Sequence, residues 1–433
     1  MRNVLRSLVS KLVPTGYLAE NRRDDLRSEL VELRTQIEAL QRQLEVARRA
    51  AHQVSRKTLS NNAFDYPEQL RQCQIEMKRT WIRHRPVGHV TGKHEIVEHV
   101  SESDDASLVE RIISAYRGAI EQEIGSKKSF WISGLMAEAK RSIHEALVLG
   151  QKDKVSQVLR KPRETALLFG FENFYDQALP RAVDLIDLWE FQAPYDILRR
   201  LAEILGTQRM ENPESFYHGL RADIPSIDQL LSEVEVAIGI PIELPNYFVG
   251  ESGLGTSRGV ATYRAFQAIY QAYRIAELVK GNKGARVLEI GGGLGRTAYY
   301  AMKFGIRDYT MIDLPMTAVA QSYFLGRSLG EDAIQLYGEN RNASMRILPP
   351  ASFFEASDKY DLILNVDSMT EMAYETASSY WQQIRARSPL FLSINHESND
   401  FTVRDLYLAS GTRQILRTPY SMRRGYVEEL VYT

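Results

Sequence analysis

Cysteine is almost absent from the sequence, since Cys73 is the only one among 433 residues. A single thiol excludes an intramolecular disulfide framework and a zinc site built from several cysteines. Long hydrophobic runs are missing too, because no apolar stretch approaches the length of a membrane-spanning helix. The N-terminal residues lack the apolar core and small-residue cleavage site of a secretory signal. We therefore expect a cytoplasmic protein.

The chain also carries little net charge. It has 54 lysines and arginines against 55 aspartates and glutamates, which gives a net charge of −1. A dedicated nucleic-acid-binding protein would be strongly basic, so nucleic acid is not an expected partner. A hydrophobic content of 44% and a charged content of 25% are those of a globular protein. The length predicts two or three domains.

Residues 22–54 carry the most regular hydrophobic pattern. Apolar side chains recur there at alternating steps of four and three, without an intervening glycine or proline, which predicts a coiled-coil seam. The seam consists of Leu26, Leu30, Leu33, Ile37, Leu40, Leu44, Ala47, Ala51 and Val54. A lone helix would leave so narrow a stripe in water, so we expect a homo-oligomer through residues 22–54. A long helix that packs on the protein's own core is the alternative.

Residues 1–14 form a short amphipathic pattern that ends at Pro14. Its apolar residues share one helical face, and its basic residues lie off that face. The pattern suits weak peripheral association with the inner face of a membrane. A helix that packs on the protein itself, or a frayed end, is the alternative.

From about Pro67 to Pro245 the hydrophobic spacing is mostly helical. The clearest predicted helices are Leu108–Ile124, Gly134–Leu149, Gln177–Leu201 and Ile227–Ala237. The sequence therefore predicts a mainly helical middle region.

The C-terminal part is organised around Arg286–Thr297, which reads R-V-L-E-I-G-G-G-L-G-R-T. An apolar run, a glycine cluster and a helical pattern follow one another, which predicts a buried strand, a tight turn and a helix. Gly291, Gly293 and Gly295 allow the backbone to turn sharply and a ligand to lie against it. The helix N-terminus adds unpaired N–H groups.

The glycine spacing indicates which ligand to expect. A dinucleotide fingerprint needs G-x-G-x-x-G, and Arg296 stands where its third glycine would be. Glu289, two residues before the first glycine, would repel a pyrophosphate and suits a cationic amine. The E-x-G-x-G-x-G pattern resembles motif I of class I S-adenosyl-L-methionine (SAM) methyltransferases. A glycine turn that serves packing alone is the alternative.

A second acid supports a nucleoside ligand. The segment Tyr309–Leu314 predicts a second strand that ends at Asp313, and in α/β nucleotide sites an acid at this place binds the ribose hydroxyls. A helix-capping role for Asp313 is the alternative. The expected cofactor-binding residues are Glu289, Gly291, Gly293, Gly295, Asp313 and Leu314.

Strands and helices alternate over the rest of the chain. A strong helix at Ala261–Lys280 precedes the glycine motif, and glycine-rich Gly250–Gly259 before it is a candidate lid. The further predicted strands are Ile334–Tyr337, Tyr360–Val366 and Leu390–Ile394, with a closing antiparallel hairpin of Gln414–Pro419 and Tyr426–Tyr432. This predicts an α/β fold with a Rossmann-like, mostly parallel sheet and a terminal antiparallel hairpin, which resembles the class I methyltransferase sheet.

Ligands in such sheets bind beyond the carboxyl ends of the strands, which points to the loops after the fourth and fifth strands. A hydroxyl acceptor needs a general base, and Glu371 and His396 are our candidates. Asp367 and Asn395 are expected to orient cofactor or substrate. A helix-start acid and an exposed loop histidine are the alternatives.

We predict no metal, although the chain offers a set of possible ligands. Asp367, Glu371 and Glu397 form the alternative of a divalent-cation site.

The C-terminal residues resemble the bacterial sugar O-methyltransferases of polysaccharide and glycan biosynthesis. The resemblance covers roughly Tyr247 to the C-terminus, and the segments that carry it are Val287–Thr297, Ile312–Pro315, Asp361–Met372 and Ser393–Glu397. It implies SAM as the cofactor, contacts to it from Glu289, Gly291, Gly293 and Asp313, and a place for Glu371 on the acceptor side. The heptad segment is not part of the family's pattern.

On this interpretation the chain has four parts. They are a short amphipathic segment (1–20), a coiled-coil helix (21–58), a mainly helical domain that covers the acceptor site (67–245) and a SAM-dependent methyltransferase domain (246–433). The expected activity is transfer of a methyl group to a sugar hydroxyl of a glycan, polysaccharide or glycoconjugate, by in-line displacement with help from a general base. The alternatives are a non-sugar acceptor and a non-catalytic coiled-coil scaffold that binds SAM.

The heptad seam predicts the effect of a truncation. Deletion of residues 1–60 should lower the molar mass of the particle in light scattering, because the chain loses its oligomerisation helix. An unchanged number of chains per particle would contradict the coiled coil.

Overall fold

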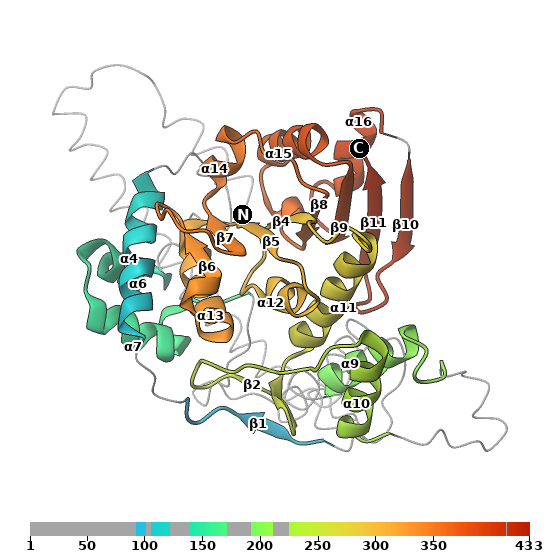
Figure 1. The fold of residues 1–433 in the computed structure, drawn as a ribbon, viewed down its shortest axis with the longest axis horizontal. Coiled ribbons are helices and arrows are strands. Elements are labelled where there is room, and N and C mark those ends of the chain that lie inside the picture. The colour runs from blue at the N-terminus through green and yellow to red at the C-terminus, as the bar shows by residue number, and fades with distance from the viewer. Residues whose placement is uncertain (1–91, 101–104, 122–138, 171–191, 211–224, 413) are drawn as a thin grey trace, which may run out of the picture. The chain divides into compact units, whose positions relative to one another are not determined.

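The computed structural model describes residues 92–100, 105–121, 139–170, 192–210, 225–412 and 414–433, and Figure 1 shows their fold. All of them belong to one compact unit, Ile75–Thr433. The predicted coiled coil at 22–54 and the amphipathic segment at 1–14 lie outside the described residues, so both stay predictions. No helix of the described part is both long enough and apolar enough to cross a membrane.

An eight-stranded sheet forms the centre of the described chain. Its strand order is β10-β11-β9-β8-β4-β5-β7-β6. The strands are β4 (Arg286–Ile290), β5 (Asp308–Ile312), β6 (Ile334–Leu336), β7 (Met345–Leu348), β8 (Leu362–Val366), β9 (Leu390–His396), β10 (Ile415–Pro419) and β11 (Tyr426–Tyr432). In the part of the sheet from β9 through β8, β4, β5 and β7 to β6, all neighbouring strands are parallel. β11 runs antiparallel to both β9 and β10. The predicted fold class, with its terminal antiparallel hairpin, is therefore confirmed.

The third strand was predicted correctly from the sequence, but the strand that follows it was missed. The predicted segment Ile334–Tyr337 contains β6, which lies at the edge of the sheet, and β7 is the strand that pairs with β5. The signal of β7 was weak because only Met345 and Ile347 are buried in its four residues. Pairing with β5 on one side and β6 on the other makes this short segment a strand.

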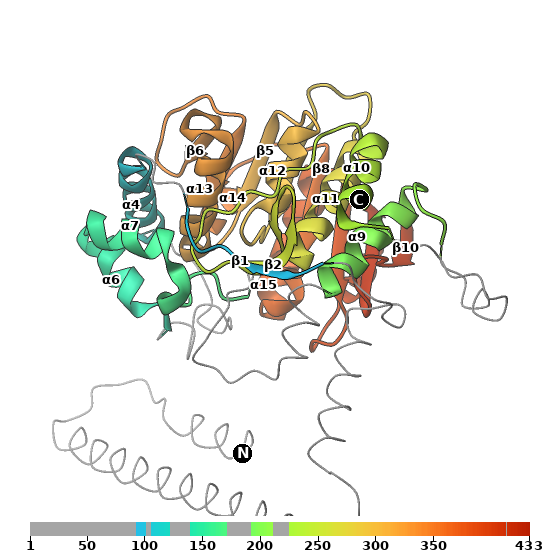
Figure 2. The same cartoon turned by 90° about the horizontal axis from the view of Figure 1, so that it is seen from below.

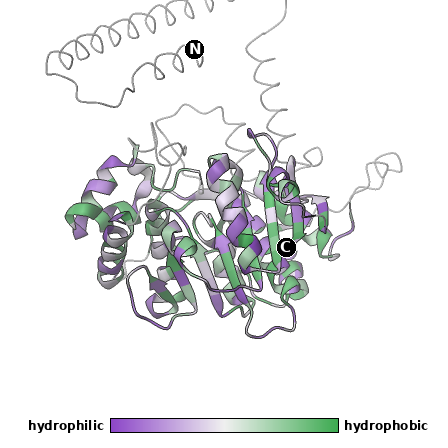
Figure 3. Cartoon of the chain, turned by 90° about the horizontal axis from the view of Figure 1, so that it is seen from above, coloured by the Kyte–Doolittle hydropathy of each residue, from purple (hydrophilic) through white to green (hydrophobic). Residues whose placement is uncertain are grey.

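Two hydrophobic cores cover the two faces of the sheet, because successive strand residues point to opposite faces. Val287 joins one core and its neighbour Leu288 the other. The helices of the first core are α11 (Tyr263–Leu278), α12 (Arg296–Lys303) and α13 (Pro315–Leu329), and those of the second are α14 (Pro350–Glu355), α15 (Tyr374–Arg387) and α16 (Val403–Ala409). Figure 1 shows the two groups on opposite sides of the strands. In Figure 3, hydrophobic residues run along the strands, and the surrounding helices carry both kinds of residue.

Helices from the middle region pack onto the first core. They are α4 (Ala106–Glu121), α6 (Arg141–Leu149), α7 (Lys152–Arg160), η1 (Pro162–Thr165), α9 (Ala193–Ile204) and α10 (Ile227–Ile238). In Figures 1 and 2, α4 lies beside α13 and α9 lies near α11. The prediction of a helix at Ile227–Ala237 is confirmed, and the other three predicted helices continue into residues outside the described ranges. The described middle-region helices thus share a hydrophobic core with the sheet.

The candidate lid is a small sheet instead. Residues of Gly250–Gly259 form β2 (Ser252–Thr256) and the start of β3 (Gly259–Ala261), and β2 also pairs with β1 (His94–Ile96). A Cβ atom on Gly253 would lie 2.3 Å from the carbonyl oxygen of Ala261. This glycine therefore serves close packing, and the prediction of a lid was wrong.

The shared core predicts what truncation of a middle-region side chain will do. Leu108 is fully buried, and a Cβ atom on Gly326 of α13 would lie 2.8 Å from it. Leu108→Ala should lower the free energy of unfolding by about 2–5 kcal/mol in urea denaturation, because it leaves a cavity between α4 and α13. Leu149→Ala, at a side chain that is 69% exposed, is the control and should change it by less than about 0.5 kcal/mol. Equal effects would contradict the shared core.

Candidate functional site

The glycine motif forms the turn between β4 and α12. Gly291, Gly293 and Gly295 have φ values of 72°, 57° and 90°, a region that side chains other than glycine rarely adopt. A Cβ atom on Gly291 would lie 2.1 Å from the Oγ of Ser368, which belongs to the loop after β8. Glycine is thus required here both by the backbone angle and by the close approach of a second loop.

Glu289 is buried near the end of β4, with an exposure of 1%. Its Oε2 accepts a hydrogen bond of 2.9 Å from the Tyr309 hydroxyl. Burial raises the pKa of Glu289 to about 7, because removal from water disfavours the charged carboxylate. The negative charge of the nearby Asp313 raises this pKa further. The carboxyl therefore changes its charge near neutral pH.

Asp313 follows β5 directly. Its Oδ1 accepts a hydrogen bond of 2.8 Å from the Leu314 N–H, and its Oδ2 accepts one of 2.6 Å from Gln321. Burial raises the pKa of Asp313 to about 7 as well, although these hydrogen bonds act in the opposite direction. β4 and β5 pair in parallel, so the two carboxyls stand at the same edge of the sheet.

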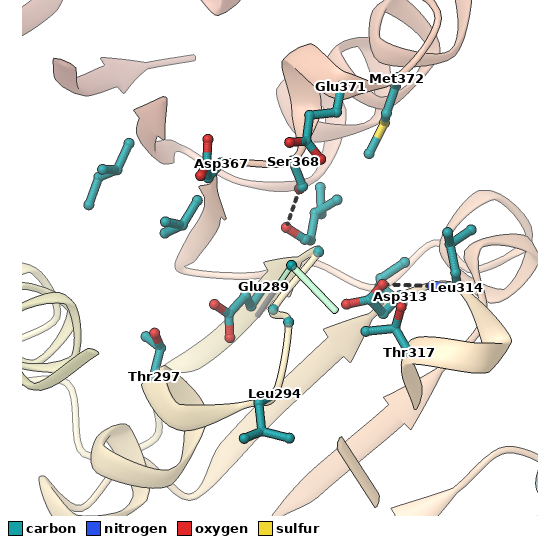
Figure 4. Close-up of a pocket in the computed structure, with 18 of the residues that line it drawn as sticks. Glu289, Leu294, Thr297, Asp313, Leu314, Thr317, Asp367, Ser368, Glu371 and Met372 are labelled. Carbon is teal, nitrogen blue, oxygen red and sulfur yellow. Dashed lines mark hydrogen bonds between the residues drawn. The ribbon is translucent and has the colours of Figure 1, made fainter. Parts of the chain in front are cut away.

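A cavity of about 450 Å³ lies at this edge, a volume in the usual range for small-molecule sites. Glu289, Gly291, Gly293, Asp313 and Leu314 line it, as predicted for a cofactor. Figure 4 shows the wall with Glu289 and Asp313 together with Asp367, Ser368 and Glu371 from the loop after β8. Gly295 is not part of the lining; it caps α12, where a Cβ atom would lie 2.9 Å from Leu325.

The candidate catalytic residues come together in space. One ligand atom each of Asp367, Glu371 and His396 lies within 4.8 Å of the others. Asp367 and Glu371 line the cavity, whereas His396 does not. Glu397, part of the alternative cation set, points elsewhere and forms an ion pair of 2.7 Å with Arg417.

Asn395 has a different place from the one predicted. It is buried, and its side-chain N–H donates to the Oδ1 of Asn365 at 2.9 Å. Asn365 in turn donates to the carbonyl of Ile290 at 2.9 Å. The two asparagines therefore connect the ends of β9, β8 and β4 and do not line the cavity.

Several residues of the cavity wall were not predicted from the sequence, because they lie outside the loops that follow the parallel strands. The list comprises Phe169 and Gly170 from the middle region, Arg264, Gln267 and Gln271 of α11, and Tyr420, Arg423 and Tyr426 of the terminal hairpin. The sequence predicted only an antiparallel hairpin in this terminal segment and no residue of a site. Arg296, the residue in place of a third glycine, is buried. It forms an ion pair of 3.0 Å with Glu251, which directly precedes β2.

The solved structures that resemble part of this chain include two methyltransferases. The glycopeptide N-methyltransferase MtfA in complex with SAM is 15% identical, with 38% of this chain and 94% of that chain covered at a TM-score of 0.31. The methyltransferase domain of the bacterial protein CtHen1 is 7% identical, with 38% and 97% covered at a TM-score of 0.29. No protein-family model and no curated protein matches the chain. Likenesses this distant carry no argument about activity, which must come from the site.

The raised pKa of Glu289 predicts how stability depends on pH. The folded chain holds a proton on Glu289 up to about pH 7, whereas the unfolded chain releases it near its ordinary value of 4.5. The contribution to stability is therefore complete below pH 4.5 and is lost as the pH rises, by about 3 kcal/mol at pH 8. Glu289→Gln should remove this loss and unfold at higher urea than the wild type at pH 8.

The matched control for that measurement is Glu355→Gln, since Glu355 is exposed. It should leave the pH dependence of the urea midpoint as it is in the wild type. Parallel curves for wild type and Glu289→Gln between pH 5 and pH 8 would contradict the raised pKa.

Proposed function

We propose that this chain is a SAM-dependent O-methyltransferase that acts on a hydroxyl of a sugar. One observation carries the proposal: two buried carboxyls, Glu289 and Asp313, end adjacent strands and line one cavity together with a glycine turn. The acceptor class rests on the resemblance to sugar O-methyltransferases and is the less direct part of the proposal.

The residues present fit SAM. Burial disfavours the charge on both carboxyls, and a ligand with a positive charge and donor hydroxyls compensates for that cost. In this proposal Glu289 and the turn at Gly291 and Gly293 hold the methionine end, and Asp313 accepts hydrogen bonds from the ribose. SAM, when bound, supplies an electrophilic methyl group on a positively charged sulfur.

A dinucleotide suits the site less well. Arg296 occupies the place of the third fingerprint glycine, and its guanidinium is committed to Glu251 in a buried ion pair. The pair joins the start of α12 to the small sheet of β1, β2 and β3, so it fixes the wall of the cavity. Glu289 would also repel a pyrophosphate.

The acceptor side of the cavity offers carboxylates and aromatic surface. Asp367 and Glu371 supply proton acceptors, which a hydroxyl needs at neutral pH. Phe169 and Phe354 also line the cavity and are 52% and 39% exposed. Exposed aromatic rings at a cavity suit the apolar face of a sugar ring.

We also propose that residues 22–54 join copies of the chain and that residues 1–14 rest weakly on the inner face of a membrane. These proposals suit an acceptor that is a lipid-linked glycan or a surface polysaccharide. They rest on the heptad seam and the amphipathic pattern alone.

The cofactor is tested by calorimetric titration of the full-length chain with SAM and, separately, with NAD. We expect micromolar binding of SAM and no binding of NAD. The transfer of a radiolabelled methyl group from SAM to a panel of nucleotide sugars and oligosaccharides then tests the activity. Binding of SAM without transfer to any acceptor would favour the scaffold alternative, and absence of SAM binding would refute the proposal.

The affinity for SAM should depend on pH. In this proposal SAM binds the ionised form of each carboxyl. A carboxyl with a pKa of about 7 is mostly protonated at pH 6, so each such group should weaken binding about tenfold from pH 8 to pH 6. Titration at pH 6 in buffers of different ionisation enthalpy should also detect release of protons. Glu289→Gln should bind more weakly than the wild type at pH 8 and with a smaller pH dependence. An affinity that is constant from pH 6 to pH 8 would contradict this role.

A further inference from the structure

Asp367 has an unusual backbone conformation at the acceptor end of the cavity. Its φ is 55°, and Ala166 is the one other non-glycine residue of the described chain with a positive φ. Asp367 directly follows β8, and its N–H donates to the carbonyl of Ile394 on β9 at 2.9 Å. The side chain is thereby directed into the cavity from the gap between two neighbouring strands.

This position lies next to the glycine turn. Ser368, the next residue, donates through its Oγ to the carbonyl of Ile290 at 3.2 Å, and it is the group that excludes a side chain at Gly291. Asp367 is therefore held beside the segment that is proposed to bind the methionine end of SAM.

The two carboxylate oxygens of Asp367 have different surroundings. Oδ2 accepts a hydrogen bond of 2.7 Å from the Tyr426 hydroxyl and lies 3.6 Å from a guanidinium nitrogen of Arg423. Oδ1 is buried from solvent, accepts no hydrogen bond and lies 3.5 Å from the Nε2 of His396. The exposed 22% of the side chain does not include Oδ1, so Oδ2 is the carboxylate oxygen left for contact with an acceptor.

The hydrogen bonds of His396 determine which of its nitrogens carries the proton. The backbone N–H of Ser398 donates to Nδ1 at 3.3 Å, and the Oγ of Ser398 lies 2.7 Å from the same nitrogen. A backbone N–H can only donate, so in the neutral ring Nδ1 is the acceptor and Nε2 carries the hydrogen. That hydrogen faces Asp367, and His396 does not line the cavity. His396 therefore places a polar hydrogen next to the Asp367 carboxylate and does not reach an acceptor in the cavity.

We propose that Asp367 takes the proton from the acceptor hydroxyl, and that Tyr426 and His396 are positioning residues for its carboxylate. The proposal rests on the proposed methyltransferase function and assigns its base. In the reaction the acceptor oxygen forms a bond to the methyl carbon, the carbon–sulfur bond breaks with its electron pair going to sulfur, and the hydroxyl proton goes to Oδ2 of Asp367. The products are the methyl ether, S-adenosylhomocysteine and a neutral Asp367 carboxyl.

The first test compares Asp367→Asn with Asp332→Asn in the full-length chain. Asparagine tolerates the positive φ, and Asp332 is an exposed surface control. Asp367→Asn should bind SAM as the wild type does and lower kcat for methyl transfer by about 10²- to 10⁴-fold, and Asp332→Asn should change neither. Asp367→Glu, which keeps a carboxylate, should recover part of the rate.

Three outcomes of the activity measurements would overturn the proposal. One is undiminished transfer by Asp367→Asn with normal SAM binding. A second is a larger loss for Glu371→Gln than for Asp367→Asn, which would make Glu371 the base. A third is loss of activity with EDTA and recovery with Mn²⁺, which would make Asp367, Glu371 and His396 ligands of a cation. A wild-type chain that binds no SAM would instead refute the proposed function itself.

Tyr426 is tested against a tyrosine on the same strand. Tyr426→Phe should lower kcat by about tenfold and alter its pH profile, because the carboxylate loses its hydrogen-bond donor. Tyr432→Phe, at an exposed position at the end of β11, should leave rate and profile unchanged. A rate and a pH profile identical to those of the wild type in Tyr426→Phe would remove Tyr426 from the proposal.

The role of His396 is tested without any acceptor. Long-range ¹H–¹⁵N spectra of the full chain with ¹⁵N-labelled histidine, assigned with His396→Gln, should show the tautomer with the hydrogen on Nε2. Ser398→Ala should disturb this signal and no other histidine signal. The tautomer with the hydrogen on Nδ1 would free Nε2 to act as a base and would overturn the assignment.

Discussion

The burial of two carboxyls at one edge of the sheet is the constraint on which the rest of the site depends. Glu289 and Asp313 stand at the ends of parallel strands, and both have pKa values raised to about 7 because they are removed from water. Because both pKa values are higher in the folded chain than in the unfolded chain, the two carboxyls lower the free energy of unfolding at neutral and higher pH. A bound ligand with a positive charge would offset this loss, because it interacts favourably with the buried carboxylates.

The surrounding structure keeps these carboxyls close to the glycine turn. Tyr309 donates to Glu289, Gln321 donates to Asp313, and Ser368 packs so closely on Gly291 that only glycine fits there. The asparagines of β8 and β9 connect the strand ends below the loops. A rigid frame of this kind reduces the reorganisation that ligand binding requires.

The middle region takes part in the same structure. Its described helices share a hydrophobic core with α11 and α13, and Phe169 and Gly170 reach the cavity wall. The buried ion pair of Glu251 and Arg296 ties the small sheet of β1, β2 and β3 to the start of α12. The middle region and the terminal hairpin thus complete the wall of the cavity that begins at the strand ends.

The sequence by itself determined the strand–turn–helix at Arg286–Lys303, the acid after the second strand, the central strands and the antiparallel hairpin. These signals are local, because buried parallel strands need continuous apolar runs and a tight turn needs glycine. Tertiary structure alone decided that Met345–Leu348 and not Ile334–Leu336 pairs with β5, and that Asn395 braces the strands while Tyr426 contacts Asp367. Tyr426 and Asp367 are 59 residues apart, and such pairings depend on register and packing between distant strands, which no local pattern of residues records.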